Sequence, residues 1–101
     1  MVLKNFMHLN IFSRGIEHYE LFNKIFNILQ QNTLLLIQDG VYCGLKLQET
    51  TISSYTTNNI YALDQDVIGR GLASNYPKYI KLINYNDFVN LVLHHEKTIT
   101  Y

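Results

Sequence analysis

The sequence lacks the features that mark secreted, membrane-spanning or nucleic-acid-binding proteins. It has one cysteine, so no internal disulfide can form, and this favours a reducing compartment. Eight basic residues balance eight acidic ones without a lysine or arginine cluster, so direct nucleic-acid binding is not expected. No apolar run approaches the roughly 20 residues of a membrane span, and the first residues lack the pattern of a signal peptide. We therefore predict a cytoplasmic protein with no direct nucleic-acid or membrane partner.

Charge is scarce overall. Only 16% of the residues are charged, whereas 48% are hydrophobic, which argues against disorder and for a substantial core. A small domain with so few charged side chains cannot cover its whole surface with them, so some apolar surface is expected to be covered by a partner. The length of 101 residues predicts a single domain over residues 1–101.

The most informative stretch is the aliphatic run at residues 34–37, which ends in Gln38-Asp39-Gly40. A short continuous apolar run bounded by a turn signal is typical of a strand buried on both faces, here residues 33–38. The end of such a strand is where ligands and partners usually meet an open α/β sheet. Asp39 is expected to cap the helix that follows, and Gly40 to form the turn.

Strands and helices alternate along the rest of the chain. We predict strands near residues 3–12, 60–63, 79–83 and 98–101, and helices over residues 16–30, 41–47, 65–72 and 85–96, with a polar loop at 48–59. Asp64 and Asn84 precede two of the helices as expected N-caps, and Asp87 completes a variant of the capping box. Phe88, Val89 and the apolar residues after them predict a broad buried face. This order indicates a three-layer α/β/α sandwich around a mainly parallel sheet of about five strands.

Cys43 is the only candidate nucleophile of note. It follows the predicted buried strand, where a thiol at a helix N-terminus would be activated. Alternatively, it is a small apolar residue packed on a short helix and flanked by Tyr42 and Leu45, since free cysteine is often buried. The sequence has no C-x-x-C motif, which would have favoured a catalytic role for Cys43.

Carboxylates and histidines offer weaker candidates. Asp39, Asp64 and Asp66 follow strand ends, so they could form a magnesium or general-base site, or simply cap helices. The histidines lack the spacing of the usual zinc motifs, and His94 and His95 point about 100° apart on a helix. We therefore predict no metal and no cofactor. The eight tyrosines suit either an interface or a small, partly buried core.

Three blocks of the sequence resemble the TusB/DsrH family. Residues 34–41, LLLIQDGV, are similar to the family's "LLLLQDGV". Residues 61–72, YALDQDVIGRGL, are similar to "YAL-x-x-D-x-x-A-R-G-L", and residues 83–91, INYNDFVNL, to "IDYTDFVRL". The blocks come in the family's order, and the resemblance extends over nearly the whole chain from about residue 7. It implies a DsrE/DsrF/DsrH-like fold.

The resemblance also implies a subunit of a sulfur-relay complex. Such a subunit joins TusC-like and TusD-like chains in a heterohexamer that takes persulfide sulfur from a TusA-like donor and passes it to a TusE-like acceptor, toward 2-thiolation of the tRNA wobble uridine. TusB subunits generally lack the reactive cysteine, and none is recognised in the family at the position of Cys43. The resemblance therefore implies a non-catalytic partner of the TusD-like subunit. Its signature and interface candidates are Gln38, Asp39, Gly40, Val41, Asp66, Arg70, Gly71, Asp87 and Phe88.

Three alternatives stay open on the sequence alone. Cys43 could itself carry a persulfide, which would make the chain a sulfurtransferase. The complex could serve sulfur oxidation, as the DsrEFH relatives do. Setting the resemblance aside, the chain could be an isolated α/β module that binds a small ligand at the carboxyl ends of its strands.

Overall fold

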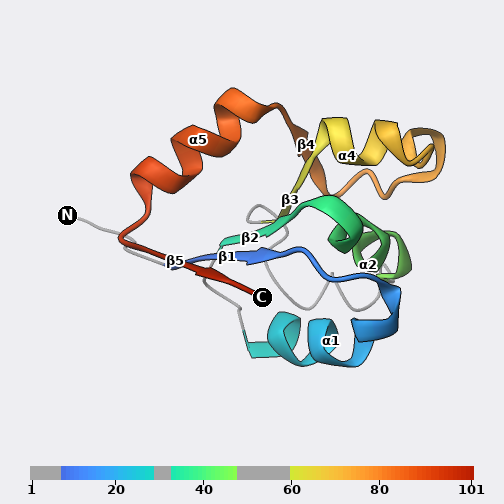
Figure 1. Cartoon of the computed structure of the whole chain (residues 1–101), viewed down its shortest axis with the longest axis horizontal. Coiled ribbons are helices and arrows are strands. Elements are labelled where there is room, and N and C mark those ends of the chain that lie inside the picture. The colour runs from blue at the N-terminus through green and yellow to red at the C-terminus, as the bar shows by residue number, and fades with distance from the viewer. Residues whose placement is uncertain (1–7, 29–32, 48–59) are drawn as a thin grey trace.

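The chain folds around a five-stranded sheet in which every pairing is parallel (Figure 1). The computed structural model describes residues 8–28, 33–47 and 60–101. The strands lie in the order β4-β3-β2-β1-β5. Their bounds are β1 His8–Phe12, β2 Thr33–Leu36, β3 Ile60–Leu63, β4 Lys81–Ile83 and β5 Lys97–Thr100.

Helices connect the strands. The α-helices are α1 Tyr19–Ile28, α2 Val41–Lys46, α4 Asp64–Gly69 and α5 Tyr85–His94, and the short 3-10 helices are η1 Ile16–His18, η2 Gln38–Gly40 and η4 Ala73–Asn75. None of the helices in the described ranges is long and apolar enough to cross a bilayer. The alternation of strands and helices confirms the predicted α/β class.

The strand order places the helices on two faces. From β1 to β4 each strand lies beside the one before it, and the chain then returns over the sheet to place β5 beside β1. Because crossovers between parallel strands are right-handed, α5, which makes this return, lies on the opposite face of the sheet from the helices before it. The packing agrees: Phe22 of α1, Cys43 of α2 and Val67 of α4 belong to one core cluster. Phe88 and Leu91 of α5 pack against a second, smaller cluster. Figure 1 shows α5 and α1 on opposite sides of the sheet. The three-layer sandwich is thus confirmed.

β2 is the central strand, as its aliphatic run predicts. Every residue of Thr33–Leu36 is buried. Leu34 and Leu36 belong to the larger cluster and Leu35 to the smaller one, because successive side chains point to opposite faces. The strand ends at Leu36, two residues earlier than predicted. Gln38 has a φ of 51° and belongs to η2, a conformation that a strand cannot continue through.

Other predicted boundaries also shift. β4 begins at Lys81 instead of residue 79, because Ile80 donates its N–H to the carbonyl of Pro77 in a turn. α4 ends at Gly69 and α5 at His94, earlier than predicted. β1 ends at Phe12 as expected. Residues 3–7, 29–30 and the predicted loop at 48–59 lie outside the described residues.

The N-terminus of α5 confirms the predicted capping box. The side-chain Oδ1 of Asn84 accepts from the backbone N–H of Asp87 at 2.8 Å, and Asp87 Oδ2 accepts from the N–H of Asn84 at 3.5 Å. The predicted burial of α5 is wrong, however. The helix has no fully buried residue, and the side chains of Val89, Val92 and Leu93 are exposed. They were expected to face the core of this chain, but each is more than a third exposed in the part of the chain that the structure describes.

Candidate functional site

The residues that follow β2 and β3 meet at one edge of the sheet. Since the two strands are parallel neighbours, their carboxyl ends lie side by side. Gln38, in η2 after β2, donates its backbone N–H to Asp66 Oδ2 in α4 at 2.6 Å. A positive φ in a non-glycine residue costs of order 1 kcal/mol or more. The hydrogen bond to a carboxylate helps to offset that cost and fixes the turn against α4.

Arg70 joins the two carboxylates of this edge. Its Nε and one terminal nitrogen both lie 3.0 Å from Asp39 Oδ1, and the other terminal nitrogen lies 3.3 Å from Asp66 Oδ1. The side chains of Arg70 and Asp66 are only 27% and 16% exposed, whereas that of Asp39 is 62% exposed. We call Gln38, Asp39, Asp66 and Arg70 the carboxyl-edge cluster. It holds the turn after β2 against the end of α4.

Gly71 explains how Arg70 comes to point at this cluster. Gly71 has a φ of 72°, and the N–H groups of Gly71 and Leu72 donate to the carbonyls of Ile68 and Val67. This paired closure is a Schellman motif, which ends α4 and uses a residue with left-handed backbone just past the helix. Arg70 is therefore the last residue before the chain leaves the helix, one turn beyond Asp66.

The prediction that Asp39 caps the following helix is wrong. Gly40 is the N-cap of α2, and no side chain makes a capping hydrogen bond there. Asp64 was also expected as a cap, but it is the first residue of α4, whose N-cap is Leu63. Asp39 instead pairs with Arg70, which lies 31 residues away in the sequence.

The carboxylates of the carboxyl-edge cluster are paired with a guanidinium. Within residues 8–28, 33–47 and 60–101, no group of three or more histidine, cysteine or carboxylate side chains is placed to hold an ion. The guanidinium of Arg70 pairs with Oδ1 of Asp39 and Oδ1 of Asp66, and Asp66 Oδ2 accepts from the N–H of Gln38. The arrangement is suited to fixing backbone geometry.

Gly40 and Val41 follow Asp39 directly in the chain. A Cβ added to Gly40 would overlap the carbonyl oxygen of Phe12, at the end of β1. That oxygen also accepts from the N–H of Ile37 at 3.1 Å. The carbonyl of the buried Val41 accepts from the hydroxyl of Tyr76 at 2.8 Å. The turn after β2 is thus packed against the end of β1, and the start of α2 is hydrogen-bonded to Tyr76.

Cys43 is fully buried in α2. Its Sγ lies 3.6 Å from the carbonyl oxygen of Gly15 and 3.8 Å from that of Arg14, so the thiol can donate to the loop after β1. Burial, together with the negative charge of Glu17, raises the pKa of Cys43 to about 11, against a smaller opposing effect of Lys46. A neutral, enclosed thiol is a poor nucleophile.

The crevice that such sheets offer to small ligands is filled. The switch point lies between β1 and β5, since the chain leaves β1 in one direction and β5 arrives from the other. There Ser13 donates its N–H and its hydroxyl to the carbonyl of Tyr101, at 3.2 and 3.0 Å. The ring of Tyr101 packs on Phe12, with their centroids 6.5 Å apart. This does not favour a ligand-binding module.

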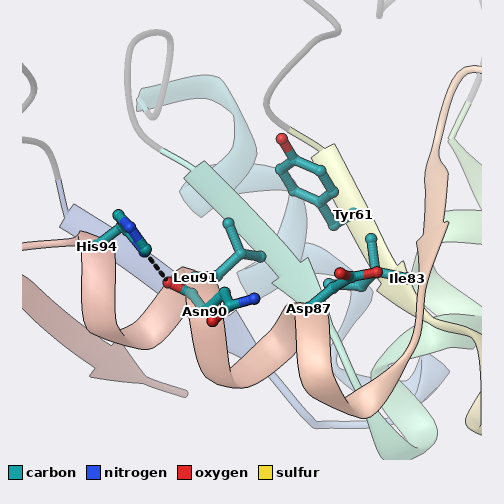
Figure 2. A pocket seen from close by; sticks show the side chains of 6 residues that line it. All are labelled: Tyr61, Ile83, Asp87, Asn90, Leu91 and His94. Carbon is teal, nitrogen blue, oxygen red and sulfur yellow. Dashed lines mark hydrogen bonds between the residues drawn. The ribbon is translucent and has the colours of Figure 1, made fainter.

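Asp87 and Phe88, the other signature candidates, belong to α5. Phe88 packs against the smaller core cluster, and Asp87 serves the capping box. Asp87 also lines a groove of about 300 Å³ that the sequence did not predict. Figure 2 shows it between α5 and the strands β3 and β4, lined by Tyr61, Ile83, Asp87, Asn90, Leu91 and His94. His94 caps its own helix there, with Nδ1 2.7 Å from the carbonyl oxygen of Asn90.

Comparisons with known proteins identify the family. The pattern described as "DsrH like protein" matches residues 17–98. Proteins named "Protein TusB" from Yersinia pestis and Yersinia pseudotuberculosis are 36% identical over 74 residues, which is 70% of this chain and 76% of theirs. The chain belongs to the TusB/DsrH family.

Two solved structures share its fold. The solution structure of Tm0979 from Thermotoga maritima is 29% identical, with a TM-score of 0.66 over 89% of this chain and 95% of that one. The crystal structure of the YchN protein from E. coli has a TM-score of 0.62 at 16% identity, over 94% of this chain and 99% of that one. The DsrE/DsrF/DsrH-like architecture is thus confirmed.

The three blocks that resemble the TusB/DsrH family can now be placed in the structure. The first two blocks contribute the members of the carboxyl-edge cluster, and the third contains the capping box and the start of α5. The residues of these three blocks therefore hold the ends of β2, β3 and β4 in place. Within the described ranges, they make contacts that organise the fold.

We expect Arg70→Met to lower the free energy of unfolding by about 1–2 kcal/mol. The substitution keeps the aliphatic stem but leaves the mostly buried carboxylate of Asp66 without its cation. The Asp39 pair is exposed and contributes less. Urea unfolding followed by circular dichroism measures the change. Lys78→Met, at an exposed position, is the control; equal midpoints for the two variants would show that the cluster does not stabilise the fold.

Proposed function

We propose that this chain is a non-catalytic subunit of a cytoplasmic sulfur-relay complex of the TusBCD type. The complex passes persulfide sulfur toward 2-thiolation of the tRNA wobble uridine. In this proposal the whole chain, residues 1–101, is one DsrH/TusB-like domain. It joins TusC-like and TusD-like subunits in a heterohexamer, and the cysteine of the TusD-like subunit receives sulfur from a TusA-like donor and hands it to a TusE-like acceptor.

Family membership and the state of Cys43 support this proposal. The relatives named "Protein TusB" match over most of the chain. Persulfide transfer needs an accessible thiolate on each carrier. Cys43 is enclosed, hydrogen-bonded to backbone carbonyls, and has a pKa raised to about 11. The observation that carries the passive role is this enclosure of the chain's one cysteine.

The proposal predicts that Cys43→Ser leaves tRNA thiolation intact. The serine hydroxyl can donate to the same carbonyls, so the fold is retained. The variant would replace the chromosomal copy, and the 2-thiouridine content of bulk tRNA would be measured by mass spectrometry. Deletion of the gene is the reference for complete loss. Cys→Ser in the TusD-like subunit, expected to abolish thiolation, is the matched control.

The outcomes separate the alternatives. Loss of thiolation in Cys43→Ser, with the complex still assembled on affinity purification, would mean that Cys43 carries sulfur itself. Intact-mass measurement after incubation with a persulfide-loaded donor checks this directly, as a gain of one sulfur atom that Cys43→Ser abolishes. Unchanged 2-thiouridine after deletion of the gene would instead point to the sulfur-oxidation role.

A further inference from the structure

Strand β5 forms one edge of the sheet. Among the strands that the structure describes, β1 is its only neighbour (Figure 1). Tyr101, which follows β5, donates its N–H to the carbonyl of Ile11 at 2.8 Å, and its own carbonyl accepts from the N–H of Ser13 at 3.2 Å. The peptide groups of Tyr101 therefore face β1. Because these groups alternate along a strand, those of Thr98 and Thr100 face away from β1. We call residues 97–101 the β5 edge.

The two edges of the sheet differ in how well they are protected against pairing with another strand. Proteins protect an edge strand by keeping it short or by placing lysine or proline in it. β4, at the other edge, has three residues and begins at Lys81. β5 has four, and its contact with β1 continues through Tyr101. The only charged side chain of the β5 edge is that of Lys97, at its start. The β5 edge is therefore the longer and less protected of the two.

The α5 side of the β5 edge is accessible to a second chain. Thr98 and Thr100 lie opposite Leu9 and Ile11 of β1, whose side chains belong to the smaller core cluster on the α5 side of the sheet. Side chains of paired residues point to the same face, so both threonines also lie on that side. Both are exposed. The helix thus covers β1 and leaves β5 uncovered on this face.

The sequence of the β5 edge is complementary to itself. Two copies related by a two-fold axis perpendicular to the sheet bring their β5 strands together antiparallel. With the axis at Ile99, Thr98 of each copy lies opposite Thr100 of the other, and Lys97 lies opposite Tyr101. Each threonine pair is then a hydrogen-bonded pair, in which the outward N–H and C=O groups bond to each other. Threonine pairs, and a lysine beside an aromatic ring, are favourable cross-strand neighbours.

Charge and overlap favour this register over the others that a two-fold axis allows. An axis at Lys97 would place the two lysines directly opposite each other, which destabilises a sheet. An axis at Thr98 or Thr100 would pair only part of the β5 edge with itself, whereas an axis at Ile99 pairs all of it. The axis at Ile99 therefore gives the most cross-strand contacts without opposing like charges.

We infer that two copies of this chain associate through the β5 edge, in an antiparallel pairing centred on Ile99 that joins their sheets into one. The inference goes beyond the proposed function, because it needs no other subunit. Residues 97–101 alone are far fewer than the roughly 20–30 residues that each partner contributes to a standard interface. The dimer is therefore weak and reversible, and it forms at high protein concentration.

The test is sedimentation equilibrium of the full chain from about 10 μM to 1 mM, the range in which a weak dimer forms. The unmodified chain should show a reversible monomer–dimer equilibrium. Thr98→Lys/Thr100→Lys places lysine opposite lysine in both threonine pairs, so we expect its Kd to be about tenfold higher or more. Thr98→Lys/Thr100→Glu is the matched control. It places lysine opposite glutamate in both pairs, so its Kd should stay within about threefold of the unmodified value.

Each other result overturns the inference. A chain that is monomeric at every concentration does not pair through any edge. Equal dimerisation of the unmodified chain and Thr98→Lys/Thr100→Lys would place the contact elsewhere on the surface. Loss of the dimer in both double variants would exclude the register centred on Ile99, because only that register brings residue 98 of one copy opposite residue 100 of the other. Circular dichroism checks that each variant is folded, as expected for substitutions at exposed positions.

Discussion

Gly40→Ala is expected to destabilise the protein by about 3 kcal/mol or more. The backbone of Gly40 has a φ of −61°, which alanine adopts freely, so the effect is one of space alone. The new Cβ would overlap the carbonyl of Phe12, and its next neighbour is Ser13 Cα, at 3.2 Å. Both belong to the backbone at the end of β1, so neither can rotate away as a side chain would. Overpacking of this kind costs roughly 1–3 kcal/mol where side chains can adjust, and more where they cannot.

Urea unfolding of Gly40→Ala, compared with Gly69→Ala, measures this effect. Gly69 is the last residue of α4, and a Cβ added there has no atom within 4 Å. Since alanine favours the helix over glycine, Gly69→Ala should leave stability unchanged or raise it by up to about 1 kcal/mol. If Gly40→Ala unfolded at the same urea concentration as Gly69→Ala, the close approach of the turn to β1 would be absent.

The carboxyl-edge cluster shows which parts of this fold a single sequence can predict. Central strand β2 was predictable because continuous aliphatic residues and a Gln-Asp-Gly turn are local signals. The capping box at Asn84 was predictable for the same reason, since its partners are three residues apart. The pairing of Asp39 with Arg70 was not, because it joins residues that only the parallel pairing of β2 and β3 brings together.

The α5 helix shows a second limit. Its apolar residues predict burial, and the pattern does not say whether the covering surface belongs to the same chain. In the structure Phe88 and Leu91 pack on the sheet, whereas Val89 and Leu93 remain exposed. The groove beside them was also unforeseen, because Tyr61 and Asn90 share no local pattern and meet only when α5 crosses the sheet. The low charge content and the eight tyrosines of the sequence were the residue-level signals that surface would be left for a partner.

Native Cys43 is expected to react with iodoacetamide about a hundredfold or more slowly than the same thiol in the urea-unfolded chain. Burial raises its pKa from 9.0 to about 11, so near neutral pH the thiolate fraction falls by about two orders of magnitude. Enclosure under the loop after β1 slows access further. The rate should be measured by intact mass between pH 7 and 9, with the unfolded chain as the reference.

The same pKa shift makes the stability of the protein fall as the pH rises into the alkaline range. The fold favours the neutral thiol, so the stability that this contributes is complete below pH 9 and is lost as pH rises toward about 11. Cys43→Ala removes the ionising group, so its stability should fall less steeply with rising pH over this range. Burial also raises the pKa of Tyr76, and the loss of stability that this causes is present in both proteins and must be subtracted from both curves. Rapid labelling of the native thiol at neutral pH, at the rate of the unfolded chain, would contradict the enclosure. It would also return Cys43 to the position of a persulfide carrier, because access and ionisation are the two properties that a relay cysteine needs and that this packing withholds.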